Sequence, residues 1–209
     1  DAYGCVRTSG FTGSGTTITV NPTSVGGTLS AATQDVCITS GTISALTLSG
    51  HTGTITKWEL QPPSGSYTTT SPNGAGSTTS PVTNGFTTVG TYNYRVEVKS
   101  GVCPSTYSTV GQVVAFPASV GGTAGVSGLS TICTGNTATM IVSGNTGTTI
   151  QWEESDDNGA SDAWTNAVGG TGATTTTYTT PVLTSSIYYR AKVQSGPCVS
   201  ANSTSQLVS

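Results

Sequence analysis

The stretch that decides the fold is YRVEVKSGVC, Tyr94–Cys103, which is written a second time as YRAKVQSGPC, Tyr189–Cys198. Counted from two residues earlier, the first copy has an apolar residue at every second position: Tyr92, Tyr94, Val96 and Val98. A period of two over about eight residues predicts a β-strand with one face in a core and the other in water. Both copies then end in Ser-Gly, one further residue and a cysteine, so the chain contains the same strand, turn and cysteine at least twice.

The repetition extends well beyond this strand. The segment PTSVGGT, Pro22–Thr28, recurs as PASVGGT, Pro117–Thr123, and SGHTGTITKWE, Ser49–Glu59, recurs as SGNTGTTIQWE, Ser143–Glu153. Self-similarity at a fixed period indicates a tandem array. The segment Tyr3-Gly4-Cys5 resembles the end of one more copy.

The repeat divides the chain into three predicted parts. Residues 1–19 are expected to be the end strand of a preceding repeat or a strand donated to another subunit. Residues 20–115 are expected to form a first module and residues 116–209 a second module, each long enough to bury one core. The glycine-rich stretch Val120–Gly125 reads as an inter-module hinge.

The coarse pattern predicts an all-β fold of two tandem immunoglobulin-like antiparallel β-sandwiches, with about seven strands each, plus the N-terminal strand segment. Trp58 and Trp152 fall on the buried face of an inner strand, and Leu46, Leu48, Met140 and Val142 are expected to point inward from an earlier one. For the second module the expected strands are 125–129, 137–143, 149–154, 163–168, 175–180, 186–194 and 203–208.

Composition excludes several classes of function. The chain has six Lys and Arg against nine Asp and Glu, so it has no basic surface for nucleic acid. Its longest apolar runs are far shorter than the roughly 20 residues that span a bilayer, so no membrane span is expected. Five cysteines in so uncharged a chain are typical of an oxidising compartment. We therefore expect an extracellular or cell-surface protein.

The combination of a cysteine, Gly-x-Thr-Gly before a tryptophan, and Tyr-Tyr-Arg ending in Ser-Gly-x-Cys resembles the immunoglobulin-like tandem repeats of large secreted and cell-surface proteins of Bacteroidetes. The likeness covers residues 20–209, although Asn93 replaces the first tyrosine of the triplet in the first module. The resemblance implies a spacer or fibre module of an adhesin or filament. It implies as partners copies of the chain itself or neighbouring repeats of a longer chain.

The cysteines of the two modules have matched spacing. Cys37 precedes Cys103 by 66 residues and Cys133 precedes Cys198 by 65, which favours one disulfide within each module and leaves Cys5 unpaired or intermolecular. A rival pairing joins neighbouring modules, Cys5 with Cys37 and Cys103 with Cys133. Zinc ligation is not expected, because the chain has no Cys-x-x-Cys and a single histidine.

Two groups of residues are candidate binding sites. The acidic turn of the second module has the oxygen ligands that Ca²⁺ prefers: Glu154, Asp156, Asp157, Asn158 and Asp162. Trp164 and Tyr188 are expected to face outward, where aromatic rings can stack on surface glycans. The acidic turn is absent from the first module, and a plain turn is the competing reading.

No arrangement predicts catalysis. Glu153 and Glu154 are adjacent on a strand and point to opposite faces, so they cannot act as the paired carboxylates of a glycosidase. No Gly-x-Ser-x-Gly elbow is present. We therefore expect a non-enzymatic structural module without a cofactor. The alternatives are a carbohydrate-binding module and a pilin-like subunit that polymerises by strand donation through residues 1–19.

Overall fold

The computed structural model describes residues 19–30, 33–38, 41–70 and 73–209. Most of the predicted N-terminal strand segment, and Cys5 with it, lies outside these residues. The chain separates into two compact units, Asp1–Ala115 and Phe116–Ser209, called here the first and the second module. The described residues form sixteen strands, β1 to β16, and no helix, so none of them provides a helix able to cross a bilayer. The all-β prediction is confirmed.

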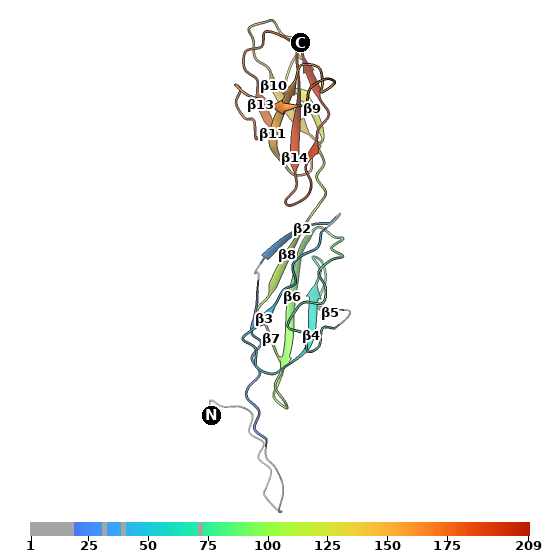
Figure 1. Ribbon diagram of the computed structural model, residues 1–209, viewed down its shortest axis with the longest axis vertical. Coiled ribbons are helices and arrows are strands. Elements are labelled where there is room, and N and C mark those ends of the chain that lie inside the picture. The colour runs from blue at the N-terminus through green and yellow to red at the C-terminus, as the bar shows by residue number, and fades with distance from the viewer. Residues whose placement is uncertain (1–18, 31–32, 39–40, 71–72) are drawn as a thin grey trace, which may run out of the picture. The chain divides into compact units, whose positions relative to one another are not determined.

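The first module consists of two sheets (Figure 1). The small sheet pairs β1 (Thr28–Leu29) with β3 (Leu48–Ser49). The large sheet has the order β2, β8, β6, β4, β5, and β7 also pairs with β6. Its strands are β2 (Thr33–Cys37), β4 (Thr54–Gln61), β5 (Thr68–Thr69), β6 (Gly90–Lys99), β7 (Thr106–Tyr107) and β8 (Gly111–Phe116).

The second module also has a small and a large sheet, but its small sheet has a third strand and its large sheet has no counterpart of β2. Its small sheet has the order β13, β10, β9, and its large sheet has the order β12, β11, β14, β15, with β16 also paired to β14. The strands of the small sheet are β9 (Thr123–Val126), β10 (Thr139–Ser143) and β13 (Thr177–Thr179). Those of the large sheet are β11 (Thr148–Ser155), β12 (Thr165–Asn166), β14 (Ile187–Gln194), β15 (Ala201–Asn202) and β16 (Gln206–Val208).

The two large sheets share the same antiparallel register. Trp58 stands opposite Val96 in the first module, and Trp152 stands opposite Ala191 in the second. Both inner strands also carry an irregularity two or three residues before the tryptophan. An irregularity of the strand ladder is a specific local geometry, not a random defect. Because it recurs at the same place in both modules, the sequence repeat is also a structural repeat.

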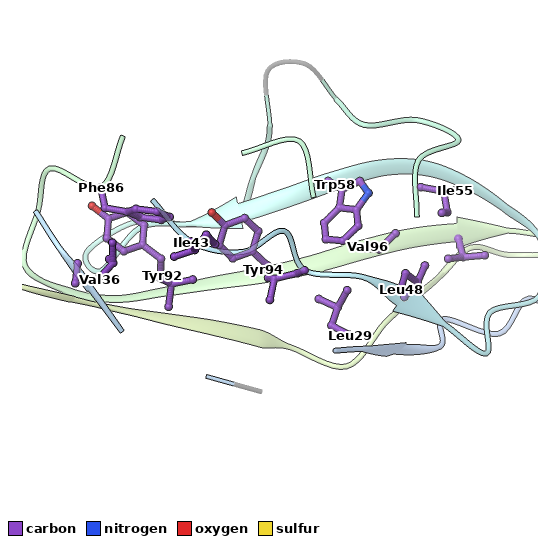
Figure 2. Close-up of a cluster of buried hydrophobic side chains, with 14 residues drawn as sticks. Leu29, Val36, Ile43, Leu48, Ile55, Trp58, Phe86, Tyr92, Tyr94 and Val96 are labelled. Atoms are coloured by element: carbon purple, nitrogen blue, oxygen red, sulfur yellow. The ribbon is translucent and has the colours of Figure 1, made fainter. Parts of the chain in front are cut away.

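Each module buries its own core around a fully covered tryptophan. Figure 2 shows Trp58 in the middle of the first core, with Phe86 and Tyr92 toward one end and Ile55 and Leu48 toward the other. Both indole Nε1 atoms donate to a backbone carbonyl oxygen 2.9 Å away, Trp58 to Ser77 and Trp152 to Thr175. A buried indole with a satisfied N–H provides large apolar burial without a polar penalty. The inward positions predicted for the earlier strand are buried as well: Leu46, Leu48, Met140 and Val142.

The last predicted strand of the second module begins too early. Of the expected residues 203–208 only β16, from Gln206, is a strand, and an unpredicted strand, β15, precedes it at Ala201–Asn202, with residues 203–205 between the two. The buried Ser203 accepts a hydrogen bond from the Ala191 N–H on its hydroxyl and donates its own N–H to the Ala191 carbonyl. Ser108 bonds to Val96 in the same way in the first module. A side chain that substitutes for the backbone ladder interrupts a strand, which the alternation of apolar residues does not reveal.

The expected hinge at residues 120–125 is also wrong, because these residues are paired with other segments of the second module. Val120 bridges to Thr146, and β9 begins at Thr123. A Cβ added at Gly121 would collide with the carbonyl group of Asn202, and Gly122 has a φ of 73°. The glycines therefore permit a close crossing of two backbone segments and a left-handed conformation.

Candidate functional site

The strongest repeated constellation of polar side chains is a cross-strand ion pair on the outer face of each large sheet. In the first module Arg95 Nε lies 2.7 Å from Glu59 Oε2, and in the second Arg190 Nε lies 2.7 Å from Glu153 Oε2. The pairs form because each glutamate stands directly opposite its arginine in the strand register. Both glutamates are buried although they lie on the outer face.

Aromatic rings cover both arginines. The Arg95 guanidinium carbon lies 3.8 Å from the ring centroid of Tyr67 and 3.9 Å from that of Tyr107. The Arg190 guanidinium carbon lies 4.3 Å from the ring centroid of Trp164. An arginine over an aromatic face is held by cation–π attraction and shields its ion pair from water.

The first module extends its cluster with a second cation and a second carboxylate. Lys57 Nζ lies 2.6 Å from Glu59 Oε1 and 3.6 Å from Glu97 Oε2. Burial alone would raise the pKa of Glu59, but the hydrogen bonds from Lys57 and Arg95 outweigh burial and lower it. The pKa of Glu97 is lowered chiefly because the Ser105 hydroxyl donates to it. These charges neutralise one another, so the cluster has no free acid or base poised for catalysis.

The structure places the two candidate glycan residues on the same outer face as Arg190. Trp164 contacts the Arg190 guanidinium, and Tyr188 lies two residues from Arg190 along β14, so its side chain points to the same side. Both aromatic residues are partly exposed. One face of the indole is therefore occupied by arginine, and a glycan would meet the remaining surface.

The acidic turn of the second module is organised around one carboxylate. Asp157 Oδ1 accepts hydrogen bonds from the N–H groups of Gly159 and Ala160, and Oδ2 accepts from the N–H and hydroxyl of Ser161. The Ser161 hydroxyl and these N–H groups hold the pKa of Asp157 well below its usual range. An oxygen surrounded by hydrogen-bond donors is unavailable to a cation.

The other members of the calcium prediction do not complete a site. Asn158 adopts a left-handed conformation, with a φ of 64°, that serves the turn. Glu154, Asp156 and Asp162 line a surface pocket, and burial raises the pKa of Glu154. In the described part of the chain, no three His, Cys, Asp or Glu side chains are grouped so that they could hold a metal ion.

The cysteines differ from the predicted pairing. Cys37, Cys103 and Cys198 are disulfide-bonded, whereas Cys133 is a free and exposed thiol. The expected bridge between Cys133 and Cys198 is therefore not formed. The rival bridge between Cys103 and Cys133 is not formed either, and Cys5 lies outside the described residues.

The geometry of the first module explains why equal spacing was misleading. Cys103 Sγ lies 3.4 Å from the carbonyl oxygen of Pro22, beyond the end of β6. Cys37 lies near the start of β6, because its neighbours Ile38 and Gly41 share a surface pocket with Phe86. The six residue steps from Tyr92 to Val98 separate these ends by about 20 Å. A disulfide needs Cα atoms within about 7 Å, so Cys37 and Cys103 cannot bridge their own module.

The second module also has its two cysteines at opposite ends. Cys198 Sγ lies 3.1 Å from the carbonyl oxygen of Pro117, where the chain enters the module. Cys133 lines a pocket with Val208 and Ser209, where the last strand finishes. We call these the entry end and the exit end; the exit end of the first module, where β8 finishes, carries Cys37. Every module thus has one cysteine at each end.

Sequence reasoning found the aromatic residues and the cysteines but missed the ion pairs. Glu59 and Arg95 are 36 positions apart, and only the strand register shows that they face each other. A signal was present, because Trp-Glu and Tyr-Arg recur at the same places in both copies.

Comparison with solved structures gives distant similarities. The fibronectin(III)-like modules of Clostridium thermocellum CbhA match with 14% identity and a TM-score of 0.35, over 86% of this chain and 90% of that one. The SGBP-B protein of the Bacteroides ovatus mixed-linkage glucan utilization locus, in complex with a mixed-linkage heptasaccharide, matches with 16% identity and a TM-score of 0.27. This match covers 87% of the chain but only 43% of the Bacteroides ovatus protein.

No curated protein matches the chain in sequence. One family model, described as a domain of unknown function (DUF8696), matches residues 25–117 and again residues 120–209. The chain therefore belongs to the DUF8696 family and carries two consecutive copies of its domain.

Proposed function

We propose that the chain is a non-enzymatic structural part of an extracellular bacterial surface adhesin or fibre, in which sandwich modules linked through disulfides act as spacer or assembly units. The observation that carries this proposal is what the two copies share. The core tryptophan, the glycine crossing, the shielded ion pair and the cysteine at each end all recur. These are features of packing and connection. The residues with catalytic or ligand chemistry do not recur, since His51 is matched by Asn145 and the acidic turn occurs once.

The same chemistry supports an extracellular location. Three of the four described cysteines are disulfide-bonded, and disulfides persist in oxidising compartments. The low content of charge is compatible with side-by-side packing of modules in a fibre.

The test combines location with shape. Intact cells of the source organism are treated with a protease that cannot enter them, and material sheared from their surface is examined by negative-stain electron microscopy. We expect loss of the protein from intact cells, and filaments or chains of modules in the sheared material. Recovery of the protein only from the cytosol, with its thiols reduced, would contradict the proposal.

A second candidate function is glycan binding by the second module, favoured by the placement of Trp164 and Tyr188 on one outer face around Arg190. The test is a glycan array with the intact chain and with Trp164→Ala, using Val182→Ala as a control at an exposed position that follows β13 of the small sheet. Binding that is lost in Trp164→Ala and retained in the control supports a carbohydrate-binding module. An array without hits would exclude glycan binding by the second module.

The third candidate, polymerisation by strand donation, depends on residues 1–19, nearly all of which lie outside the described residues. Deleting them tests it directly. A deleted chain that still assembles into the same filaments excludes strand donation and leaves the spacer proposal intact.

A further inference from the structure

We propose that Cys133 is a covalent attachment site, which forms a disulfide with the entry-end cysteine of another module of the same family. This inference rests on the proposed structural function and specifies how the modules are joined. Cys133 is free and exposed, whereas Cys37, the cysteine at the same end of the first module, is disulfide-bonded. The same position is thus already used for a disulfide once in the same chain.

The partner must approach from outside the module that holds Cys133. The only other cysteine of that module is Cys198, which is disulfide-bonded at the opposite end. The seven residue steps of β14, from Ile187 to Gln194, separate the two ends by about 23 Å. No internal rearrangement short of unfolding brings these two sulfurs together.

Chain connectivity identifies which end of a neighbour would face Cys133. In a head-to-tail array the exit end of one module is followed by the entry end of the next. The entry end carries a cysteine close to the incoming chain in both copies, with Cys103 Sγ beside Pro22 and Cys198 Sγ beside Pro117. An exit-end thiol such as Cys133 therefore meets a cysteine of this type.

The surfaces around the two kinds of cysteine are complementary. Cys133 lines a shallow pocket of about 170 Å³ together with Ile132, Leu183 and Val208. Each entry-end cysteine has an exposed valine directly beside it, Val102 at 71% exposure and Val199 at 86%. An apolar side chain of this size, carried next to the incoming cysteine, would cover apolar surface that is otherwise exposed to water.

Formation of the disulfide between Cys133 and the entry-end cysteine is a two-electron oxidation. Two thiols lose two protons and two electrons and form one S–S bond, while a disulfide oxidant of the oxidising compartment is reduced to two thiols. In the laboratory the same bond is made by exchange. Dithiodipyridine converts the Cys133 thiol to a mixed disulfide, and an incoming thiolate then attacks the Cys133 sulfur and displaces thiopyridone.

The experiment pairs full-length chains. The acceptor is the chain activated at Cys133 with dithiodipyridine. Two donors are used, each keeping a single cysteine that is therefore a free thiol: Cys198 in the Cys5→Ser/Cys37→Ser/Cys103→Ser/Cys133→Ser variant, and Cys103 in the Cys5→Ser/Cys37→Ser/Cys133→Ser/Cys198→Ser variant. We expect a covalent dimer, one thiopyridone released per cross-link, and a rate at least about ten-fold above that of glutathione at the same thiol concentration. Peptide mapping should place the cross-link between Cys133 and Cys103 or Cys198.

The acceptor carrying Cys133→Ser, treated in the same way, is the matched control and should give no dimer. A cross-link to any other cysteine, or a rate no faster than that of glutathione, overturns the proposal. Because the donor variants could fold poorly, native material is mapped as well, after alkylation of its free thiols on intact cells. A Cys133 peptide that is alkylated there contradicts covalent joining, yet modules seen in chains by microscopy would still support the spacer function.

Discussion

Tyr94 and Tyr189 occupy the same place in the two modules, but their hydroxyl groups meet different surroundings. The Tyr94 hydroxyl donates to the carbonyl oxygen of Val82 at 3.1 Å. The Tyr189 hydroxyl is buried and has no hydrogen-bond partner among the described residues. Burial raises the pKa of both phenols, so both are neutral near pH 7.

This contrast predicts opposite effects of one substitution. Tyr94→Phe removes a satisfied hydrogen bond and leaves a carbonyl unpaired, so we expect a loss of about 1 kcal/mol in the free energy of unfolding of the first module. Tyr189→Phe removes a buried hydroxyl that has no hydrogen-bond partner. We therefore expect the free energy of unfolding of the second module to stay the same or to rise by up to about 1 kcal/mol. Urea unfolding of the two variants measures both. Equal destabilisation by both substitutions would contradict the assignment.

Glu59 predicts how the first module responds to acid. Its folded-state pKa is lowered, so its carboxylate contributes stability in full above the unfolded-state pKa, and this contribution is lost as the pH falls through the folded-state value. We expect the stability of the first module to decrease below about pH 4, and Glu59→Gln to cost about 1–2 kcal/mol near neutral pH while flattening this decrease. Thermal unfolding across pH measures the slope.

Glu154 in the second module provides the opposite control. Burial raises its folded-state pKa, so its contribution to stability is present at low pH and is lost as the pH rises through the folded-state value. Because Glu154 lies in the second module, Glu154→Gln should leave the acid response of the first module unchanged. If both substitutions alter the acid response alike, the network around Glu59 is not its source.

At the scale of strands and turns, the glycine pairs of the repeated Ser-Val-Gly-Gly-Thr segment are the critical points. A Cβ at Gly121 would strike the carbonyl group of Asn202, which is backbone and cannot rotate away. At Gly125, four positions later on β9, the nearest atom to an added Cβ is 3.9 Å away, on the side chain of Ile141. The two glycines thus differ sharply in the space around them.

Gly121→Ala should therefore lower the free energy of unfolding of the second module by at least about 2 kcal/mol, as expected when backbone segments must separate. Gly125→Ala should be neutral or slightly stabilising, because alanine restricts the unfolded chain. Chemical denaturation with the tryptophan fluorescence as probe compares the two. Similar stability of both variants would show that the crossing is not needed.

The strands show how far the sequence predicts this fold. Alternation placed β6 and β14 correctly, and the β11 tryptophan was correctly predicted to be buried, because burial of one face imposes a period of two. The break at Ser203 was missed, since it arises from one hydroxyl bonding to Ala191 across the sheet. The glycines of residues 120–125 were taken for a hinge because close backbone approach and flexibility favour the same residue.

The candidate sites show where the sequence is silent. Spacing revealed that cysteines repeat but not which end of a sandwich each one occupies, so Cys37 and Cys103 were expected to meet although about 20 Å of strand separates them. The acidic turn had the composition of a calcium loop, yet Asp157 is surrounded by donors from its own turn. The sequence shows which chemical groups are present, but the contacts of each group depend on the fold.

At the scale of the whole chain, the repeat produces two cores that have no residue in common. In a tandem array stability is a sum of module terms and nearest-neighbour terms. Each module is large enough to unfold cooperatively, with a stability on the order of 5–15 kcal/mol. A defect in one core should therefore leave the other core folded.

Two matched substitutions test this independence. Trp58→Ala and Trp152→Ala each open a cavity at the centre of one core and remove an indole hydrogen bond, which costs about 3–5 kcal/mol. Because this is comparable with the stability of a single module, calorimetry should show one unfolding transition shifted strongly downward and the other nearly unchanged, with the shifted transition exchanged between the two variants. Fluorescence adds a second readout. In Trp58→Ala the two remaining tryptophans, Trp152 and Trp164, both lie in the intact second module, whereas in Trp152→Ala the buried Trp58 reports on the intact first module and Trp164 on the damaged second one. A single transition that shifts as a whole in both variants would mean that the modules unfold as one cooperative body, and a spacer built from separate modules would then be the wrong description of this chain.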